Sequence, residues 1–241
     1  MEILKLSTVD STNTWVAQHE GDLSNQAIVY CEEQTAGRGQ RGNSWESEAG
    51  ENITASMIFH PGEFEASRQF SISESVSLAI VEFLREYGVE AKIKWPNDIY
   101  VGDKKISGIL VEHHVLGRYV ARSIAGMGIN MNQEVFRSDA PNPVSLWQLT
   151  AKKNDIDEAV KKLARHLEKC LANIDEPGKT HAKFINLLWR KDGHYHNFYD
   201  RKESEQIEAR IEGVEMNGLL TLQLKGGERR QYAFKEVEFI L

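Results

Sequence analysis

The chain has 241 residues, of which 41% are hydrophobic and 27% charged, and it carries a formal net charge of -7 at pH 7. This is the ordinary composition of a soluble globular protein of one or two domains, with enough apolar residues for a core without disulfides or metals. The acidic balance argues against a general nucleic-acid-binding protein, which needs a basic face.

The two cysteines, Cys31 and Cys170, lie far apart and outside any metal-ligand motif. We therefore expect two reduced thiols, and neither a disulfide nor a metal site. The sequence does not start with a basic segment followed by an apolar run, and it contains no apolar stretch of about 18 residues. A cytoplasmic location without a membrane partner is the resulting expectation.

The hydrophobic pattern of residues 1–188 predicts both strands and helices. Residues 71–87 give the clearest helix, because they carry a wide apolar face and are followed by Gly88, which suits a left-handed cap. A Gly102-Asp103 turn is expected to join two strands in a hairpin. The other helices are expected at 14–19, 156–173 and 182–190, and the strands at 1–6, 27–32, 53–60, 92–95, 97–101, 106–113 and 119–130.

After about residue 188 the pattern changes to short strands separated by tight turns. The turns carry Gly213, the pair Asn217-Gly218 and the pair Gly226-Gly227. Short strands at this spacing indicate a small closed β-barrel or sandwich. We therefore predict an α+β domain over residues 1–188 and a β-domain over residues 189–241, with strands at 207–211, 219–224, 230–234 and 237–241.

Residues 37–42 read Gly-Arg-Gly-Gln-Arg-Gly and match the glycine spacing of a dinucleotide-binding turn. That turn requires an apolar helix to begin at the last glycine, but the residues that follow are polar and include Gly50. The ending typical of a Walker A loop is also missing. Two interpretations remain open: an anion-binding loop in which Arg38 and Arg41 hold acidic oxygens and Trp45 covers a ring, or a solvated loop whose Trp45 enters the core.

A second cluster, Lys-Trp-Pro-Asn-Asp at residues 94–98, combines a lysine at a strand end with a rigid bend, an amide and a carboxylate. This set suits the handling of a nucleotide or Mg²⁺. Lys105 comes within reach if the two strands pair, and it then neutralises a substrate carboxylate or stabilises charge in an adenylation transition state. The alternative is a plain hairpin with solvated Lys104 and Lys105. Residues 126–130, Gly-Met-Gly-Ile-Asn, indicate a strand that a ligand can approach closely.

Taken together, four blocks resemble the biotin protein ligase family. They span about residues 10–130, and the glycine-rich loop followed by Lys-Trp-Pro-Asn-Asp is highly specific. The small β-domain also resembles the C-terminal domain of these proteins. The blocks are Asp-Ser-Thr-Asn at 10–13, Glu-Gln-Thr-Ala-Gly-Arg-Gly-Gln-Arg-Gly at 33–42 with Trp45, Lys-Trp-Pro-Asn-Asp at 94–98 with Lys-Ile-Ser-Gly at 105–108, and Gly-Met-Gly-Ile-Asn at 126–130.

The resemblance implies a mixed central sheet flanked by helices, similar to class II synthetases, followed by a small SH3-like β-barrel. It also implies a two-step ligase: biotin and ATP with Mg²⁺ give biotinyl-AMP, and a lysine of a carboxylase's biotin carboxyl carrier domain then attacks it. The protein is expected to be a monomer or a homodimer. Positive groups and backbone donors fit the first step, because they offset the repulsion between the biotin carboxylate and the α-phosphate.

The roles of single residues follow from their motif positions in the resemblance. The biotin-binding set is Ser11, Thr12, Asn13, Gln34, Arg38, Gly39, Gln40, Lys105 and Gly108, in which Lys105 and Arg38 are also the catalytic pair. The ATP-binding set is Arg41, Trp45, Lys94, Asn97 and Asn130, and Asp98 is the Mg²⁺-linked carboxylate.

The sequence departs from the family pattern at Gln40, where many members carry arginine, and the lost charge is expected to weaken retention of the adenylate. The Ser-Thr-Asn block at residues 11–13 leaves no room for the helix-turn-helix domain that some members carry, so we expect neither DNA binding nor a repressor role. Two alternative functions stay open. They are a lipoate or octanoate ligase, and a non-catalytic biotin sensor, which Gln40 would favour.

Overall fold

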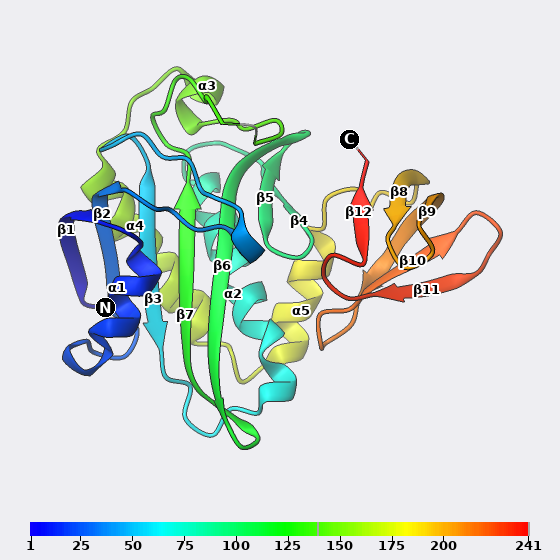
Figure 1. Cartoon of the computed structure of the whole chain (residues 1–241), viewed down its shortest axis with the longest axis horizontal. Coiled ribbons are helices and arrows are strands. Elements are labelled where there is room, and N and C mark those ends of the chain that lie inside the picture. The colour runs from blue at the N-terminus through cyan, green and yellow to red at the C-terminus, as the bar shows by residue number, and fades with distance from the viewer. Residues whose placement is uncertain (139, 241) are drawn as a thin grey trace.

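The computed structural model describes residues 1–138 and 140–240, with only the backbone of Arg41. Its centre is a seven-stranded sheet with the strand order β1-β2-β3-β7-β6-β5-β4 (Figure 1). The sheet is mixed, because β1 and β2 are parallel and every other neighbouring pair is antiparallel. The strands are β1 (Ile3–Val9), β2 (Ile28–Gln34), β3 (Ile53–Phe59), β4 (Lys92–Lys94), β5 (Asp98–Val101), β6 (Lys104–Leu116) and β7 (Tyr119–Ile129).

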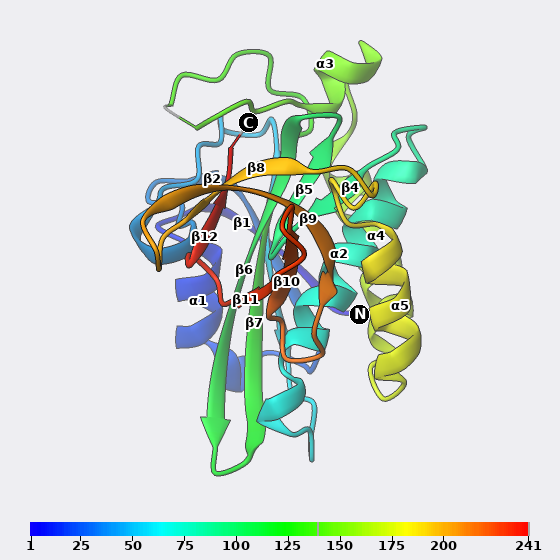
Figure 2. The ribbon, with the colours of Figure 1, turned by 90° about the vertical axis from the view of Figure 1, so that its right-hand side faces the viewer.

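Helices α2 (Phe70–Arg85), α4 (Ile156–Leu171) and α5 (Pro177–Asn186) cover one face of this sheet, and α1 (Thr12–Gln18) lies on the other face (Figures 1 and 2). Because both of its faces are covered, β3 is buried along its whole length. The predicted mixed sheet flanked by helices is therefore confirmed.

Several helix ends lie at residues that typically begin or end a helix. Gly88 follows α2 with a φ of +75°, as expected of a glycine past a helix end. Asp155 caps the start of α4, because its side chain accepts a hydrogen bond of 3.0 Å from the Glu158 backbone. Helix α5 begins at Pro177, five residues before the expected start, because proline is well tolerated in the first helical turn. Helix α3 (Leu146–Thr150) and the 3₁₀ turns η1 (Glu20–Asp22), η2 (Gln40–Gly42) and η3 (Ala66–Arg68) were not expected.

Five antiparallel strands follow α5 and form a second sheet with the order β11-β10-β9-β8-β12. This agrees with a small SH3-like domain, although the sequence did not indicate β8. Tyr232 is buried in this sheet and donates a 2.6 Å hydrogen bond to Asp200. The strands are β8 (His196–Asp200), β9 (Glu205–Val214), β10 (Leu220–Leu224), β11 (Arg229–Tyr232) and β12 (Val237–Phe239).

The second sheet packs directly against the first part of the chain. Trp95 donates an indole hydrogen bond of 2.9 Å to the Gly218 carbonyl, and its ring lies 6.4 Å from the Phe234 ring. Arg190 donates a 2.8 Å hydrogen bond to the Ile240 carbonyl. These contacts place β12 beside the β4–β5 edge of the large sheet, as Figure 1 shows. A domain boundary at residue 188 stays a prediction. Within the described ranges, no helix is long and apolar enough to span a bilayer.

Candidate active site

A cavity of about 1210 Å³ opens on the face of the large sheet that carries α1. The glycine-rich loop at residues 35–45 crosses this face in front of β7 and β6 (Figure 1). Arg41 was also predicted to belong to this site, but its side chain lies outside the described residues. The predicted site residues that do line it are Ser11, Thr12, Asn13, Gln34, Arg38, Gly39, Gln40, Trp45, Lys94, Asn97, Asp98, Lys105, Gly108 and Asn130.

One end of the cavity is a cluster of hydroxyl and amide groups around the start of α1. The Gln34 side-chain oxygen accepts hydrogen bonds from the Thr12 backbone at 2.9 Å and from the Thr12 hydroxyl at 3.2 Å. Ser56, fully buried on β3, is 2.7 Å from the Thr12 hydroxyl and donates to Asn13 Oδ1 at 2.6 Å. This hydrogen-bonded group is suited to a polar, uncharged head group, because its donors and acceptors are held in fixed directions.

Glycine allows these side chains to lie against the sheet. A Cβ built on Gly126 would approach the Asn13 amide, reaching 3.0 Å from Asn13 Cγ. A Cβ on Gly108 would lie 2.9 Å from Trp45 Cζ3 and 3.2 Å from Lys105 Cε. Larger residues on these strands would therefore fill the space that Asn13, Trp45 and Lys105 occupy.

The glycine-rich loop is folded back on itself over the cavity. Trp45 donates a backbone hydrogen bond of 2.9 Å to Gly37, and Gly39 donates one of 2.7 Å to Asn43. Gly37 cannot be replaced without movement, because a Cβ there would lie 2.6 Å from the Trp45 carbonyl oxygen. Trp45 lies against Gly108 and Gly128 rather than in a core cluster, so the solvated-loop interpretation with Trp45 in the core is wrong.

The other end of the cavity carries the lysines. The β5–β6 hairpin turns at Gly102, as expected, and brings Lys105 Nζ to 2.7 Å from Asp98 Oδ1. The same ammonium lies 5.6 Å from the centre of the Trp45 ring. Lys94 is more enclosed, 5.0 Å from the Tyr100 ring and 5.3 Å from the Phe239 ring of the second sheet. The hairpin thus gathers two cations on one wall of the cavity.

Burial lowers the pKa of Lys94, and the neighbouring charge of Lys105 lowers it further, whereas Asp98 acts in the opposite direction. Burial also raises the pKa of Tyr100, with a further increase from Asp98. An anion that enters the cavity would therefore stabilise the charged form of Lys94, because it offsets the effects of burial and of the Lys105 ammonium. This is the electrostatic setting expected of a phosphate or carboxylate subsite.

Two asparagines complete this end. Asn130 donates a hydrogen bond of 3.0 Å to the Val144 carbonyl, while its buried Oδ1 has no partner among the described residues. The Trp45 indole N–H is likewise buried without a partner in the described part of the chain. Asn97 donates to the Ile109 carbonyl, which ties the bend after Pro96 to β6. An acceptor and a donor are thus free for a ligand.

The donor set fits Mg²⁺ carried by a nucleotide rather than a metal held by the protein alone. Within the described residues, no group of three or more His, Cys, Asp or Glu side chains could hold a metal ion. Asp98 offers one carboxylate in the cavity, already paired with Lys105. Mg²⁺ in nucleotide sites typically takes one or two carboxylates, with phosphate oxygens and water completing its shell.

Several residues of the site escaped the sequence analysis. Ser56 is in sequence only one residue of a predicted strand, yet it donates to Asn13. Glu112 accepts hydrogen bonds from both Asn13 and Arg38. No local motif marks either residue, because each acquires its role through partners more than 40 positions away. The second sheet also contributes to the wall, through Arg201, Phe234, Lys235, Val237, Glu238 and Phe239.

The structure is an α+β fold whose mixed sheet carries a cavity lined by polar and charged side chains, followed by a small antiparallel β-sheet. The chain belongs to the Biotin/lipoate A/B protein ligase family, whose model matches residues 6–130. It is 32% identical over 180 residues to the Biotin–[acetyl-CoA-carboxylase] ligase of Paracoccus denitrificans, covering 72% of this chain and 74% of that protein. It is 29% identical over 228 residues to the Bifunctional ligase/repressor BirA of Escherichia coli K12, covering 92% and 69% respectively.

The fold is also that of a solved structure, the biotin protein ligase from Aquifex aeolicus in complex with biotin and ATP. The two share 24% sequence identity and superpose with a TM-score of 0.81, over 99% of this chain and 98% of the other. The similarity extends over both sheets, so the mixed central sheet and the small β-domain occur together in the relative as they do here.

Proposed function

We propose that the chain is an ATP-dependent ligase that activates biotin as biotinyl-AMP and transfers it to a lysine of a biotin carboxyl carrier domain. One observation carries this proposal. A single cavity joins a fixed amide and hydroxyl cluster at one end to a pair of lysines at the other, with the glycine-rich loop over both. An acid with a polar head group and a nucleotide both fit such a cavity. The names of the relatives favour biotin over lipoate or octanoate.

In the first step the biotin carboxylate oxygen attacks the α-phosphorus of ATP, and the bond to pyrophosphate breaks. Both reactants are anionic, so the step depends on positive charge and positioning. We assign Lys105 to the carboxylate and the reacting phosphate, with Lys94 beside it. Arg38, predicted as the catalytic partner of Lys105, pairs with Glu112 at the head-group end, and we assign it there to covering biotin. Asp98 is the carboxylate that would hold Mg²⁺ brought in with ATP, and the ion would neutralise phosphate charge there. Thr12, Asn13 and Gln34 hold the head group, so the reactive carboxylate points towards the lysines.

In the second step the acceptor lysine amine attacks the carbonyl carbon of the mixed anhydride. A C–N bond forms, AMP leaves, and the amine loses a proton. The glycine-rich loop covers the anhydride and excludes water, which would hydrolyse it. Trp45, Asn97 and Asn130 form the adenylate side of the site, and the backbone at Gly108 lets the ligand pass close to the sheet. We place the enzyme in the cytoplasm as a monomer or a homodimer.

The proposal is tested by transfer to an acceptor. Purified protein, MgATP and biotin are incubated with the carrier domain of a biotin-dependent carboxylase, and the intact mass of the acceptor is measured. We expect one biotinyl group per carrier domain with biotin and none with lipoate. A carrier variant whose acceptor lysine is arginine serves as the control. Modification with lipoate instead would favour the lipoate ligase. Biotin binding without ATP turnover or transfer would favour the sensor.

A further inference from the structure

Glu112 on β6 lies between the two elements that enclose the hydroxyl and amide end of the cavity. Its Oε2 accepts a hydrogen bond of 2.7 Å from Asn13 Nδ2, at the start of α1. The same carboxylate accepts from Arg38 Nη2 at 2.9 and 3.2 Å, and Arg38 belongs to the glycine-rich loop. Glu112 is thus bonded simultaneously to the head-group wall and to the loop that covers it.

A chain of hydrogen bonds connects Glu112 to the buried β3 strand. Ser56, fully buried, donates to Asn13 Oδ1 at 2.6 Å, and Asn13, 3% exposed, donates to Glu112. The same Asn13 amide also donates a 3.3 Å hydrogen bond to the Leu110 carbonyl of β6, which restricts its rotation. Any ligand that shifts the Asn13 amide therefore acts on the Glu112 carboxylate, and through it on Arg38.

The loop has a separate tie to the sheet at each end of the cavity. Trp45 lies against Gly108 and Gly128 at the lysine end. Arg38 is held by Glu112 at the head-group end. Register explains the separation: Gly108 pairs with Gly128, whereas Glu112 pairs with Ile124, four residues further along each strand. The head-group end therefore has a closing contact of its own.

This closing contact is suited to repeated opening. The side chains of Arg38 and Glu112 are 44% and 43% exposed. Exposed ion pairs of this kind are weak and are screened by salt, with a Debye length of about 8 Å at physiological ionic strength. A strong buried pair would hold the loop shut, whereas this one adds a modest, reversible preference for the closed loop.

We propose that Glu112 is a positioning residue that couples occupancy of the head-group subsite to closure of the glycine-rich loop. The inference rests on the proposed function, since it takes the head-group ligand to be biotin. Coupling of this kind is reciprocal: biotin favours the Arg38–Glu112 pair, and the pair slows the departure of biotin. Glu112 touches neither substrate directly and acts through Asn13 and Arg38.

The test is Glu112→Gln, which keeps an oxygen to accept from Asn13 but removes the charge that holds Arg38. The probe is biotinol, the alcohol analogue of biotin, because it lacks the carboxylate and so removes the direct effect of salt on binding to Lys105. We expect stopped-flow dissociation of biotinol to be about two- to fivefold faster in the variant at low salt. The difference should vanish near 1 M salt, where the Debye length is about 3 Å.

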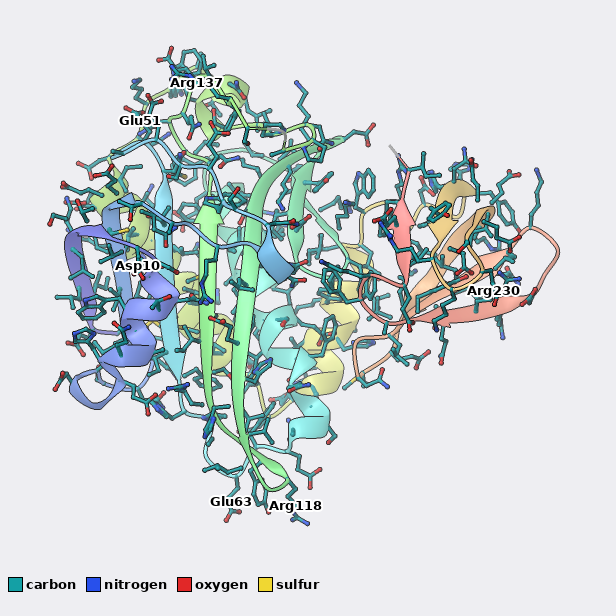
Figure 3. All side chains as sticks on the ribbon, in the orientation of Figure 1. Asp10, Glu51, Glu63, Arg118, Arg137 and Arg230 are labelled. Atoms are coloured by element: carbon teal, nitrogen blue, oxygen red, sulfur yellow. The ribbon has the colours of Figure 1, made fainter. Side chains whose placement is uncertain are left out.

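The matched control is Glu63→Gln, which removes a carboxylate at the far end of the molecule from the cavity (Figure 3). It should leave biotinol dissociation at the wild-type rate at every salt concentration. In turnover, Glu112→Gln should raise KM for biotin by the same two- to fivefold factor, with kcat within about twofold. Trypsin cleavage after Arg38 should remain slow in wild type with bound biotinol and become faster in the variant.

Two results would overturn the inference. One is a salt-independent change in dissociation, which would mean that Glu112 acts only through the packing of Asn13. The other is a dissociation rate equal to that of wild type at low salt. Failure of the proposed function looks different: a sensor would bind biotin and biotinol without turning over ATP, and a lipoate ligase would bind neither. If Glu112→Gln does not fold, the salt dependence of biotinol dissociation in wild type and Glu63→Gln still decides: a flat profile contradicts the coupling.

Discussion

Gly128→Ala tests whether Trp45 has to lie against β7 for ATP to bind. A Cβ at residue 128 would lie 2.5 Å from Trp45 Nε1 and 2.6 Å from Cζ2. Ordinary contacts between carbon atoms begin near 3.5 Å, so the indole must move by about 1 Å. Overpacking of this size costs about 1–3 kcal/mol. Trp45 is proposed to bind the adenylate, so this cost weakens ATP binding. A loss of about 1–3 kcal/mol corresponds to about a five- to 150-fold increase in KM for ATP.

The assay measures KM for ATP at saturating biotin, together with calorimetric binding of biotin without ATP. Biotin binding should change less than about twofold, because the hydrogen bonds at Asn13 lie at the other end of the cavity. Gly213→Ala is the matched control: Gly213 is also in a strand, and a Cβ there meets nothing within 4 Å. An unchanged KM for ATP, or an equal loss of biotin binding, would refute the reasoning.

Three further predictions concern single side chains. Lys105→Ala should lose adenylation with the fold retained, as shown by pyrophosphate release and circular dichroism; unchanged turnover would remove its catalytic role. Gln40→Arg should slow the release of biotinyl-AMP by about ten- to 150-fold, because charge-assisted hydrogen bonds contribute about 1.5–3 kcal/mol. The measurement is free adenylate per turnover, and equal release would contradict the prediction. Burial raises the pKa of Glu74 to about 7, although its hydrogen bond with His181 acts in the opposite direction. Because the folded state binds this proton more tightly than the unfolded state, the stabilisation by the protonated acid is complete below about pH 4.5 and is lost as pH rises through 7. Glu74→Gln should therefore gain about 2 kcal/mol relative to wild type between pH 5 and pH 8 in urea unfolding; a pH-independent difference would rule this out.

The sequence predicted the elements whose signals are local. Helix α2 carries its apolar face and its terminal Gly88 in one continuous stretch, and the Gly102 turn marks its hairpin directly. Strand β8 gave no such signal, since it is short and only two of its five residues are buried. Helix α3 is a single short turn, marked in the sequence only by its capping box, Ser145 with Gln148.

The site was predictable where residues stand in a motif and not where the fold brings them together. Lys105 was expected to come within reach of the cluster at residues 94–98, because the hairpin between them is indicated by the sequence, and it lies 2.7 Å from Asp98 Oδ1. Glu112 and Ser56 could not be found in this way, because they face Asn13 only through the order of β3, β7 and β6 in the sheet. The wall supplied by Phe239 likewise depends on how the second sheet packs against Lys94.

Biotin-dependent exchange between ATP and labelled pyrophosphate tests the central claim most directly. The purified protein is assayed with Mg²⁺ and biotin, with lipoate as the control acid. We predict exchange with biotin and none with lipoate, since the first step is reversible and needs no acceptor protein. No exchange with biotin, although calorimetry shows that biotin binds, would contradict ligase activity and leave a biotin-binding sensor.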